Sequence, residues 1–236
     1  MGLPLNEQIA IFRLILTPHI GPVSFGHLIS YYGSAEQAIL HVGELAQRGG
    51  QKKPFLLDGV SEAKKQLEQA ERDGVRILFR MENDYPMLLK EISDAPSVLF
   101  IKGNMGALRK KSVALVGTRN ASINGKALAR KMAYDLAESG YNVVSGMAHG
   151  IDRAAHVGAL ASSQIPTTTA VLGTAINEIY PEENRDIYEE IIEKGCLVSE
   201  FPYGTPMSPK LFPRRNRIIS GLTLGTVVLE AQERSG

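Results

Sequence analysis

The stretch Val113-Ala114-Leu115-Val116-Gly117-Thr118-Arg119 decides the fold. Its four apolar residues predict a short buried strand, and the glycine and polar residues behind it predict a loop. Apolar residues then recur every four positions from 128 to 136, which predicts an amphipathic helix that ends at Gly140. Asn142-Val143-Val144 predicts the next strand. A strand, a helix and a second strand in this order are typical of a parallel sheet with crossover helices.

Further short apolar runs continue this pattern on both sides. Runs that predict central strands lie at residues 169–172, 196–198 and 226–229, and runs that predict edge strands lie at 77–79 and 98–101. The fold class that we expect for residues 75–236 is therefore an α/β, Rossmann-like parallel sheet. The chain stops directly behind the last predicted strand, so we expect the natural protein to continue and this C-terminus to be truncated.

The first 74 residues have a helical pattern instead. Predicted helices cover residues 6–16, 23–32, 34–42 and 61–73, and a polar loop is expected at 49–54. For the last helix, Ser61 is the expected N-cap and Gly74 the residue that ends it. We therefore expect two domains, a small all-helical module at residues 1–74 and the sheet domain at residues 75–236.

The composition is that of a globular protein with an ordinary core. Hydrophobic residues make up 44% of the 236 residues and charged residues 22%. The net charge of +1 neither requires nor excludes nucleic acid, because a phosphate site is a local patch. The single cysteine, Cys196, excludes an internal disulfide and suits a reducing compartment. Since the sequence shows no signal-peptide pattern and no apolar run of about 20 residues, we expect a cytoplasmic protein with no membrane partner.

The residues that follow the predicted strands indicate where a ligand binds. In an open parallel sheet, ligands bind at the carboxyl ends of the strands, where loops and helix N-termini meet. These segments contain glycines, which let a ligand approach the backbone, and arginines, whose forked donors bind phosphate. An aromatic ring among them offers a stacking face for a base. The candidate DNA-binding residues are Gly117, Thr118, Arg119, Ser122, Gly146, His149, Lys210, Phe212, Arg214, Arg215, Asn216 and Arg217.

Such a combination favours single-stranded DNA as the ligand, because a charged groove with an aromatic face holds single strands without reading their sequence. The basic run at 213–217 is equally typical of a solvated helix start, so both interpretations stay open.

Other familiar sites receive less support. Arg119 replaces the second glycine of a dinucleotide fingerprint, and Ser145-Gly146 lacks the preceding glycine of a nucleophile elbow. His149, Asp152 and His156 have a spacing that could hold a metal, although a packed histidine is the commoner outcome. We expect no catalytic residue, no metal and no cofactor.

Taken in chain order, the loop segments resemble the DNA-processing protein A family (DprA, also called Smf). The resemblance covers the whole α/β part. The matching segments are Val113-Ala114-Leu115-Val116-Gly117-Thr118-Arg119, Ser145-Gly146, Gly150-Ile151-Asp152, Gly173-Thr174, Tyr180-Pro181, Ser199-Glu200, Phe212-Pro213-Arg214-Arg215-Asn216-Arg217 and Glu230-Ala231.

The resemblance implies a function and a set of partners. It implies a non-catalytic, dimeric protein that binds single-stranded DNA in natural transformation, protects it and helps to load the RecA recombinase. It also implies that the helical module is similar to a sterile-alpha-motif (SAM-like) domain. His149 and Ala175 depart from the family's usual arginine and glycine. The family's DNA pocket corresponds here to Arg119, Gly146, Lys210, Phe212, Arg215 and Asn216.

One enzymatic alternative is the lysine-decarboxylase-like (LOG) nucleotide phosphoribohydrolases, which share the Rossmann-like scaffold. Their site resembles a Pro-Gly-Gly-x-Gly-Thr stretch followed by a glutamate. Here Gly225-Thr226 precedes a strand that ends near Glu230, but no Pro-Gly-Gly stands before it. Scaffold alone does not establish function, so this alternative has little support.

Overall fold

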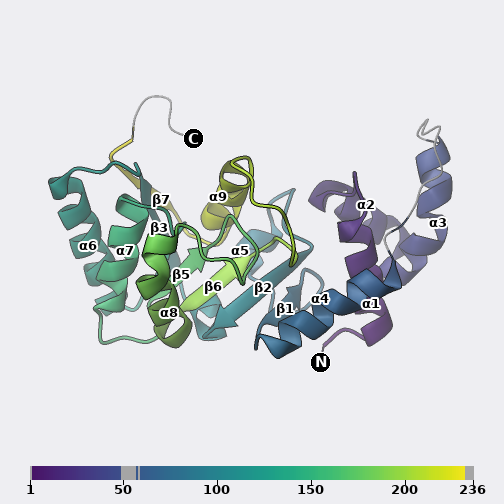
Figure 1. Ribbon diagram of the computed structural model, residues 1–236, viewed down its shortest axis with the longest axis horizontal. Helices are drawn as coiled ribbons and strands as arrows, with labels where there is room; N and C mark the ends of the chain where they lie inside the picture. The colour runs from purple at the N-terminus through teal and green to yellow at the C-terminus, as the bar shows by residue number, and fades with distance from the viewer. Residues whose placement is uncertain (1, 49–56, 58, 232–236) are drawn as a thin grey trace.

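A sheet with helices on both faces forms the larger part of the molecule, and a group of helices forms the other end (Figure 1). The computed structural model describes residues 2–48, 57 and 59–231. None of the helices in this part of the chain combines the length and the apolar composition that a bilayer crossing requires.

The described residues form one seven-stranded sheet in the order β1-β2-β6-β5-β4-β3-β7. Strands β3 to β7 are parallel, as predicted, and β2 is antiparallel to both β1 and β6. The strands are β1 (Arg76–Phe79), β2 (Val98–Gly103), β3 (Ser112–Gly117), β4 (Asn142–Ser145), β5 (Thr168–Val171), β6 (Cys196–Ser199) and β7 (Thr226–Leu229).

The position of β2 corrects the sequence prediction. The sheet is mixed rather than wholly parallel, and β2 lies inside it rather than at an edge, pairing Phe100 with Ser199 of β6. Residues 80–97 hold only the short helix α5 (Met87–Lys90), and the chain reverses over this connection. Because both faces of the sheet are covered at β2, residues 98–101 are all buried, and the run carries no alternation that would mark its position.

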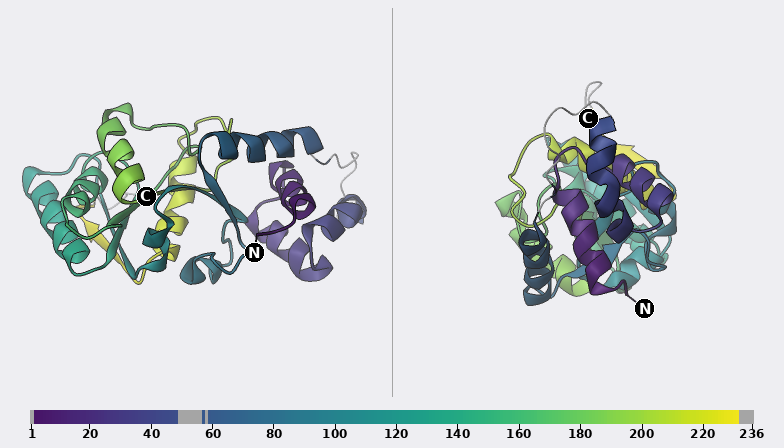
Figure 2. Two further views of the ribbon diagram at one scale, coloured as in Figure 1. Left: turned by 90° about the horizontal axis from the view of Figure 1, so that it is seen from below. Right: turned by 90° about the vertical axis from the view of Figure 1, so that its right-hand side faces the viewer.

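Helices cover both faces of the sheet. Successive residues of a strand point to opposite faces, so Leu197 of β6 belongs to one core and Val198 to the other. Helices α6 (Ile123–Glu138), α7 (Ile151–Leu160) and α8 (Arg185–Lys194) pack on one face. Helices α5 and α9 (Leu211–Gly221) pack on the other (Figure 2).

The predicted helices of the first part are confirmed, with one change at a boundary. They are α1 (Leu5–Leu16), α2 (Pro22–Tyr32), α3 (Ala35–Arg48) and α4 (Val60–Arg72). Helix α4 starts at Val60 after Gly59, so Ser61 lies inside the first turn and is not the N-cap. Gly74 has a φ of +63° and ends this helix as predicted. The polar loop predicted at 49–54 lies outside the described residues.

The helical part and the sheet share one hydrophobic core. The ring of Phe12 in α1 lies 6.1 Å from that of Phe79 in β1 and 6.0 Å from that of Phe100 in β2. All three side chains are buried. Aromatic pairs at such distances add to the stability that burial provides. The two parts are therefore held together by core packing rather than by a surface contact.

Replacing Phe12 with alanine should lower the free energy of unfolding by about 3–5 kcal/mol, because it empties the centre of this shared core. Urea denaturation followed by circular dichroism measures the change. Tyr31→Ala is the matched control, since its side chain is 80% exposed and its loss should change stability little. Equal losses in the two variants would contradict the shared core.

Candidate functional site

The loops behind β3, β4, β5 and β6 meet at the carboxyl edge of the sheet, and α9 begins beside them (Figure 1). We use "carboxyl edge" for residues 117–122, 146–150, 173–180 and 200–212. Because β3 to β6 are parallel neighbours, the loops that carry candidate residues 117–149 lie at the same edge as the start of α9, where the candidates from Lys210 onward begin.

Arg119, Phe212 and Tyr180 form a cluster at this edge. The guanidinium carbon of Arg119 lies 5.5 Å from the centre of the Phe212 ring, and the Tyr180 ring lies 5.1 Å from it at an angle of 39°. Arg119 and Tyr180 are exposed, and Phe212 is half-buried. Phe212 packs on Gly173, where a Cβ atom would lie 2.4 Å from the ring. The cluster thus presents a cation and two aromatic rings, and sequence analysis did not select Tyr180 as a site residue.

Arg215 does not lie on this surface. Its side chain is 3% exposed, and Nη1 donates hydrogen bonds to the backbone carbonyls of Gly146 and Val171. Only a residue without a Cβ fits at 146, because that atom would lie 2.5 Å from Nη1. Burial lowers the pKa of Arg215 to about 10, although the nearby Asp152 opposes the shift. Arg215 therefore supports the edge from below, and the expectation that it contacts DNA directly stays a prediction.

Arg217 and Arg214 are paired within the protein. Nη2 of Arg217 lies 2.6 Å from Oε2 of Glu200, and its Nε lies 3.0 Å from Oδ2 of Asp94. Nη2 of Arg214 lies 3.5 Å from the same Glu200 oxygen, and its guanidinium also lies over the Phe201 ring. Arg217 is mostly buried, whereas Arg214 is half exposed. Burial raises the pKa of Glu200, and the two arginines oppose this shift. Of these two cations, only Arg214 faces solvent to a large extent.

Ser122 and Thr118 are also occupied by contacts inside the chain. The Ser122 hydroxyl accepts a hydrogen bond from the Gly125 amide at 2.9 Å and donates one to the Glu230 carboxylate. The same carboxylate accepts from the Ser122 amide at 2.8 Å, and the Thr118 amide donates to the Glu230 carbonyl at 2.8 Å. Gly117 ends β3 opposite Leu229. The N-terminus of α6 is thus capped by the Ser122 side chain, and the Glu230 carboxylate binds this capping residue.

The remaining candidate residues are exposed. His149 lies in the loop behind β4, with Nε2 3.8 Å from Oε2 of Glu183. Lys210 directly precedes α9, and Asn216 lies on the outer side of that helix. Lys210 is exposed, and no ion pair of its ammonium group is found among the described residues. This group therefore faces solvent at the start of α9, the helix that carries Phe212.

The three residues with metal-like spacing do not converge. His156 is fully buried, and its Nδ1 lies 2.8 Å from the Thr168 hydroxyl. Asp152 is buried and accepts from the Ala148 amide at 3.3 Å, while His149 is exposed. Within the described ranges, no group of three His, Cys, Asp or Glu side chains is placed to hold a metal ion. His156 is the packed histidine that the alternative interpretation predicted.

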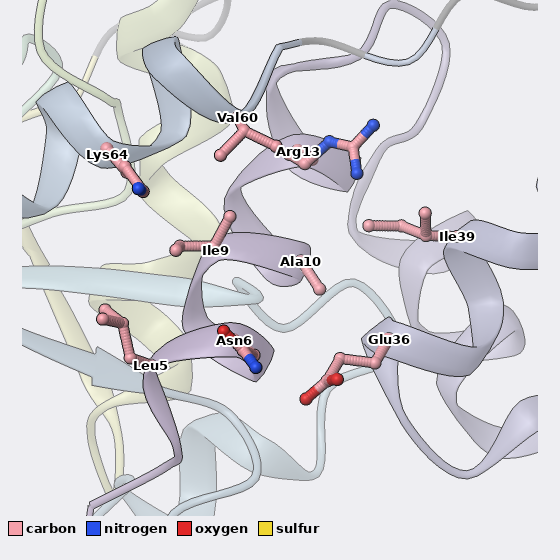
Figure 3. A pocket seen from close by; sticks show the side chains of 9 residues that line it. All are labelled: Leu5, Asn6, Ile9, Ala10, Arg13, Glu36, Ile39, Val60 and Lys64. Atoms are coloured by element: carbon pink, nitrogen blue, oxygen red, sulfur yellow. The ribbon is translucent and has the colours of Figure 1, made fainter.

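Neither of two pockets in the described part of the chain is lined by Arg119 or Phe212. One, of about 360 Å³, lies among α1, α3 and α4, with Ile9, Arg13 and Lys64 on its walls (Figure 3). The other, of about 270 Å³, lies between the α1–α2 turn and the loop behind β6, and includes Arg214.

Comparison with known proteins gives matches to both parts of the chain. Residues 76–236 match the family model for DNA recombination-mediator protein A, and residues 6–68 match that for a DprA-like N-terminal HHH domain. The helical character of the first part is thereby confirmed, while its similarity to a sterile-alpha-motif domain stays a prediction.

Two curated relatives illustrate the similarity in sequence. Protein Smf of Escherichia coli (strain K12) is 42% identical over 153 residues, which are 64% of this chain and 40% of the relative. DNA processing protein DprA of Streptococcus pneumoniae is 41% identical over 156 residues, 66% of this chain and 54% of the relative. The chain spans about half the length of the curated relatives it matches.

Two solved structures illustrate the similarity in fold. The X-ray structure of DNA processing protein A from Streptococcus pneumoniae matches all of this chain and 81% of its own, with a TM-score of 0.73 and 30% identity. The structure of DNA processing protein A from Helicobacter pylori, described for its single-stranded DNA binding mode, matches 68% of this chain and 71% of its own, with a TM-score of 0.62 and 28% identity.

His156 should make the fold sensitive to acid. Burial lowers its pKa to about 3, whereas a histidine in the unfolded chain titrates near pH 6.5. Between these values the unfolded chain binds a proton that the folded protein does not, so the free energy of unfolding falls as the pH falls, by at most about 1.4 kcal/mol per pH unit.

The difference between the protein and a His156→Gln variant isolates this contribution. Asp152 and Glu200 have pKa values raised by burial and act in the opposite direction in part of the same range, but they are present in both proteins. Urea denaturation at pH 7, 5.5 and 4.5 should show a difference that changes steadily with pH. A difference that stays constant over this range would show that His156 does not titrate as described.

Proposed function

Because the chain belongs to the DNA recombination-mediator protein A family, we propose that it binds single-stranded DNA along the carboxyl edge of its sheet. The observation that carries the proposal is the exposed guanidinium of Arg119 over the ring of Phe212. A cation beside an aromatic face supplies both interactions that a single strand needs, since one binds phosphate and the other stacks a base. The Helicobacter pylori relative, described for its single-stranded DNA binding mode, supports this choice of ligand.

The proposed contacts are fewer than the sequence predicted. Arg119 and Lys210 bind phosphate, and a base stacks on Phe212, with Tyr180 extending the aromatic surface. His149, Arg214 and Asn216 flank this centre. Gly117, Thr118, Ser122, Gly146, Arg215 and Arg217 shape the edge from within, because their polar groups or close packing are engaged by the chain itself.

Stacking and phosphate contacts do not distinguish bases well, so binding is tolerant of sequence. Every base has a stacking face, and the backbone is the same at every position. This property suits a protein that handles DNA of any origin.

For the whole protein we propose the wider role that the family resemblance implies. The protein protects incoming single-stranded DNA in natural transformation and helps to load RecA, acting in the cytoplasm as a homodimer without a catalytic step. The division into residues 1–74 and 75–236 belongs to the same proposal. The names of the relatives, DNA processing protein DprA among them, support it.

The phosphoribohydrolase alternative is not proposed. The glutamate that it would use, Glu230, is held by the Ser122 amide and hydroxyl at the start of α6. The Pro-Gly-Gly segment of that enzyme family is absent from the sequence before Gly225.

Replacing Arg119 with alanine should weaken binding to every oligonucleotide. Loss of one phosphate contact should also reduce the slope of log affinity against log salt by about 0.7, the value per phosphate for a single strand. Fluorescence anisotropy with labelled oligothymidine at several salt concentrations measures both. Arg109→Ala is the matched control, because Arg109 is exposed and lies three residues before the amino end of β3, on the opposite edge.

Replacing Phe212 with alanine tests the stacking contact separately. Binding should weaken by about 1–3 kcal/mol, while the salt slope stays that of the unmodified protein, because no charge is lost. If Phe212→Ala and Arg119→Ala both leave affinity unchanged, the DNA-binding surface lies elsewhere.

A further inference from the structure

One side chain of the helical part is paired with the backbone of a loop at the carboxyl edge. Oε1 of Gln66 in α4 accepts a hydrogen bond from the Tyr203 amide at 2.8 Å, and its Nε2 donates one to the Tyr203 carbonyl at 3.1 Å. Gln66 is 3% exposed. One carboxamide thus satisfies both backbone polar groups of one residue, as a neighbouring strand would.

The loop that Gln66 holds leads to the proposed DNA contacts. Residues 200–210 connect β6 to α9 without regular structure, and their last residue is Lys210, two positions before Phe212. Tyr203 also packs its ring against Phe100, at 5.5 Å and nearly perpendicular. Beyond Tyr203, most of residues 204–210 are exposed.

Few other hydrogen bonds fix the exposed half of this loop. Those found in the described residues are local: from Thr205 to the Pro202 carbonyl, from the Lys210 amide to the Ser208 hydroxyl at 3.4 Å, and from the Leu211 amide to the Ser208 carbonyl at 3.0 Å. Gln66 and the Phe100 contact therefore provide the loop's attachment to the rest of the molecule near Tyr203.

We infer that Gln66 is a positioning residue for DNA binding, through which the helical part sets the place of Lys210 and Phe212. The inference rests on the proposed function and assigns the helical part a task within it. Without the carboxamide, the Tyr203 amide and carbonyl lose their buried partners and take water instead, which draws the loop out of its place. Lys210 and the first turn of α9 then sample positions that do not match the Arg119 guanidinium.

The coupling acts in both directions, because linkage between two sites is reciprocal. Oligonucleotide binding at the carboxyl edge holds the loop and so stabilises the Gln66 hydrogen bonds. The factor by which the Gln66 hydrogen bonds raise DNA affinity is therefore the factor by which bound DNA favours those hydrogen bonds.

The test uses Gln66→Met, which keeps the volume of the side chain and removes both hydrogen bonds. Gln37→Met is the matched control, since Gln37 is an exposed residue of α3. Oligothymidine affinity should fall about 5-fold or more in Gln66→Met and stay unchanged in Gln37→Met. Equal affinities in the protein and in Gln66→Met would overturn the inference and leave the proposed function intact.

Two further measurements separate positioning from a general loss of stability. Amide hydrogen exchange without DNA should be faster at residues 203–210 in Gln66→Met and unchanged in the strands. In a Lys210→Ala, Phe212→Ala background, Gln66→Met should cause no further loss of affinity, because the groups that it positions are gone. An undiminished loss in that background, or unchanged exchange in the loop, would overturn the inference. Failure of the unmodified protein to bind DNA would instead overturn the proposed function.

Discussion

The buried guanidinium of Arg215 is the contact on which the carboxyl edge depends. It joins the carbonyl of Gly146, just behind β4, to that of Val171, at the end of β5. A buried arginine needs partners for its donors, and the two carbonyls supply them for Nη1. Any residue larger than glycine at 146 would displace it.

The same contact places the aromatic ring of the proposed DNA surface. Phe212 and Arg215 are three residues apart, so they lie on one face of α9. Phe212 packs on Gly173, the second residue after β5, and Arg215 packs on Gly146, the first residue after the adjacent strand β4. Fixing Arg215 therefore fixes the ring of Phe212, and Arg119 of the neighbouring loop comes to lie over it.

Some cationic side chains of the carboxyl edge are paired with carboxylates of the chain, and others are exposed to solvent. Arg217 is neutralised by Glu200 and Asp94, and Arg214 shares Glu200 with it. Buried ion pairs of this kind fix geometry and leave little charge for a ligand. A dense basic run in a sequence thus overstates the number of cations that face the solvent. The exposed Arg119 and Lys210 therefore account for a larger share of the proposed phosphate contacts.

The parallel strands and their crossover helices were predictable, because each strand is a short apolar run followed by glycine or a polar residue. The internal place of β2 was not, since its four buried residues have the pattern of any buried strand. The burial of Arg215 had a signal: its spacing from Ile218, Ile219 and Leu222 puts it on the apolar face of α9. Tyr180 had a signal only as part of the Tyr180-Pro181 segment that matches the family, and Gln66 had none, because its contact joins segments that only the folded chain brings together.

The most direct test of this account is a nitrogen-15 NMR spectrum of the arginine side chains, recorded with and without oligothymidine and assigned with single arginine variants. We predict that the Nε–H signal of Arg119 shifts on binding, while that of the buried Arg215 stays in place and exchanges slowly with water. A large shift of the Arg215 signal with an unmoved Arg119 signal would contradict the account, because Arg215 would then be the ligand contact and not the support beneath it.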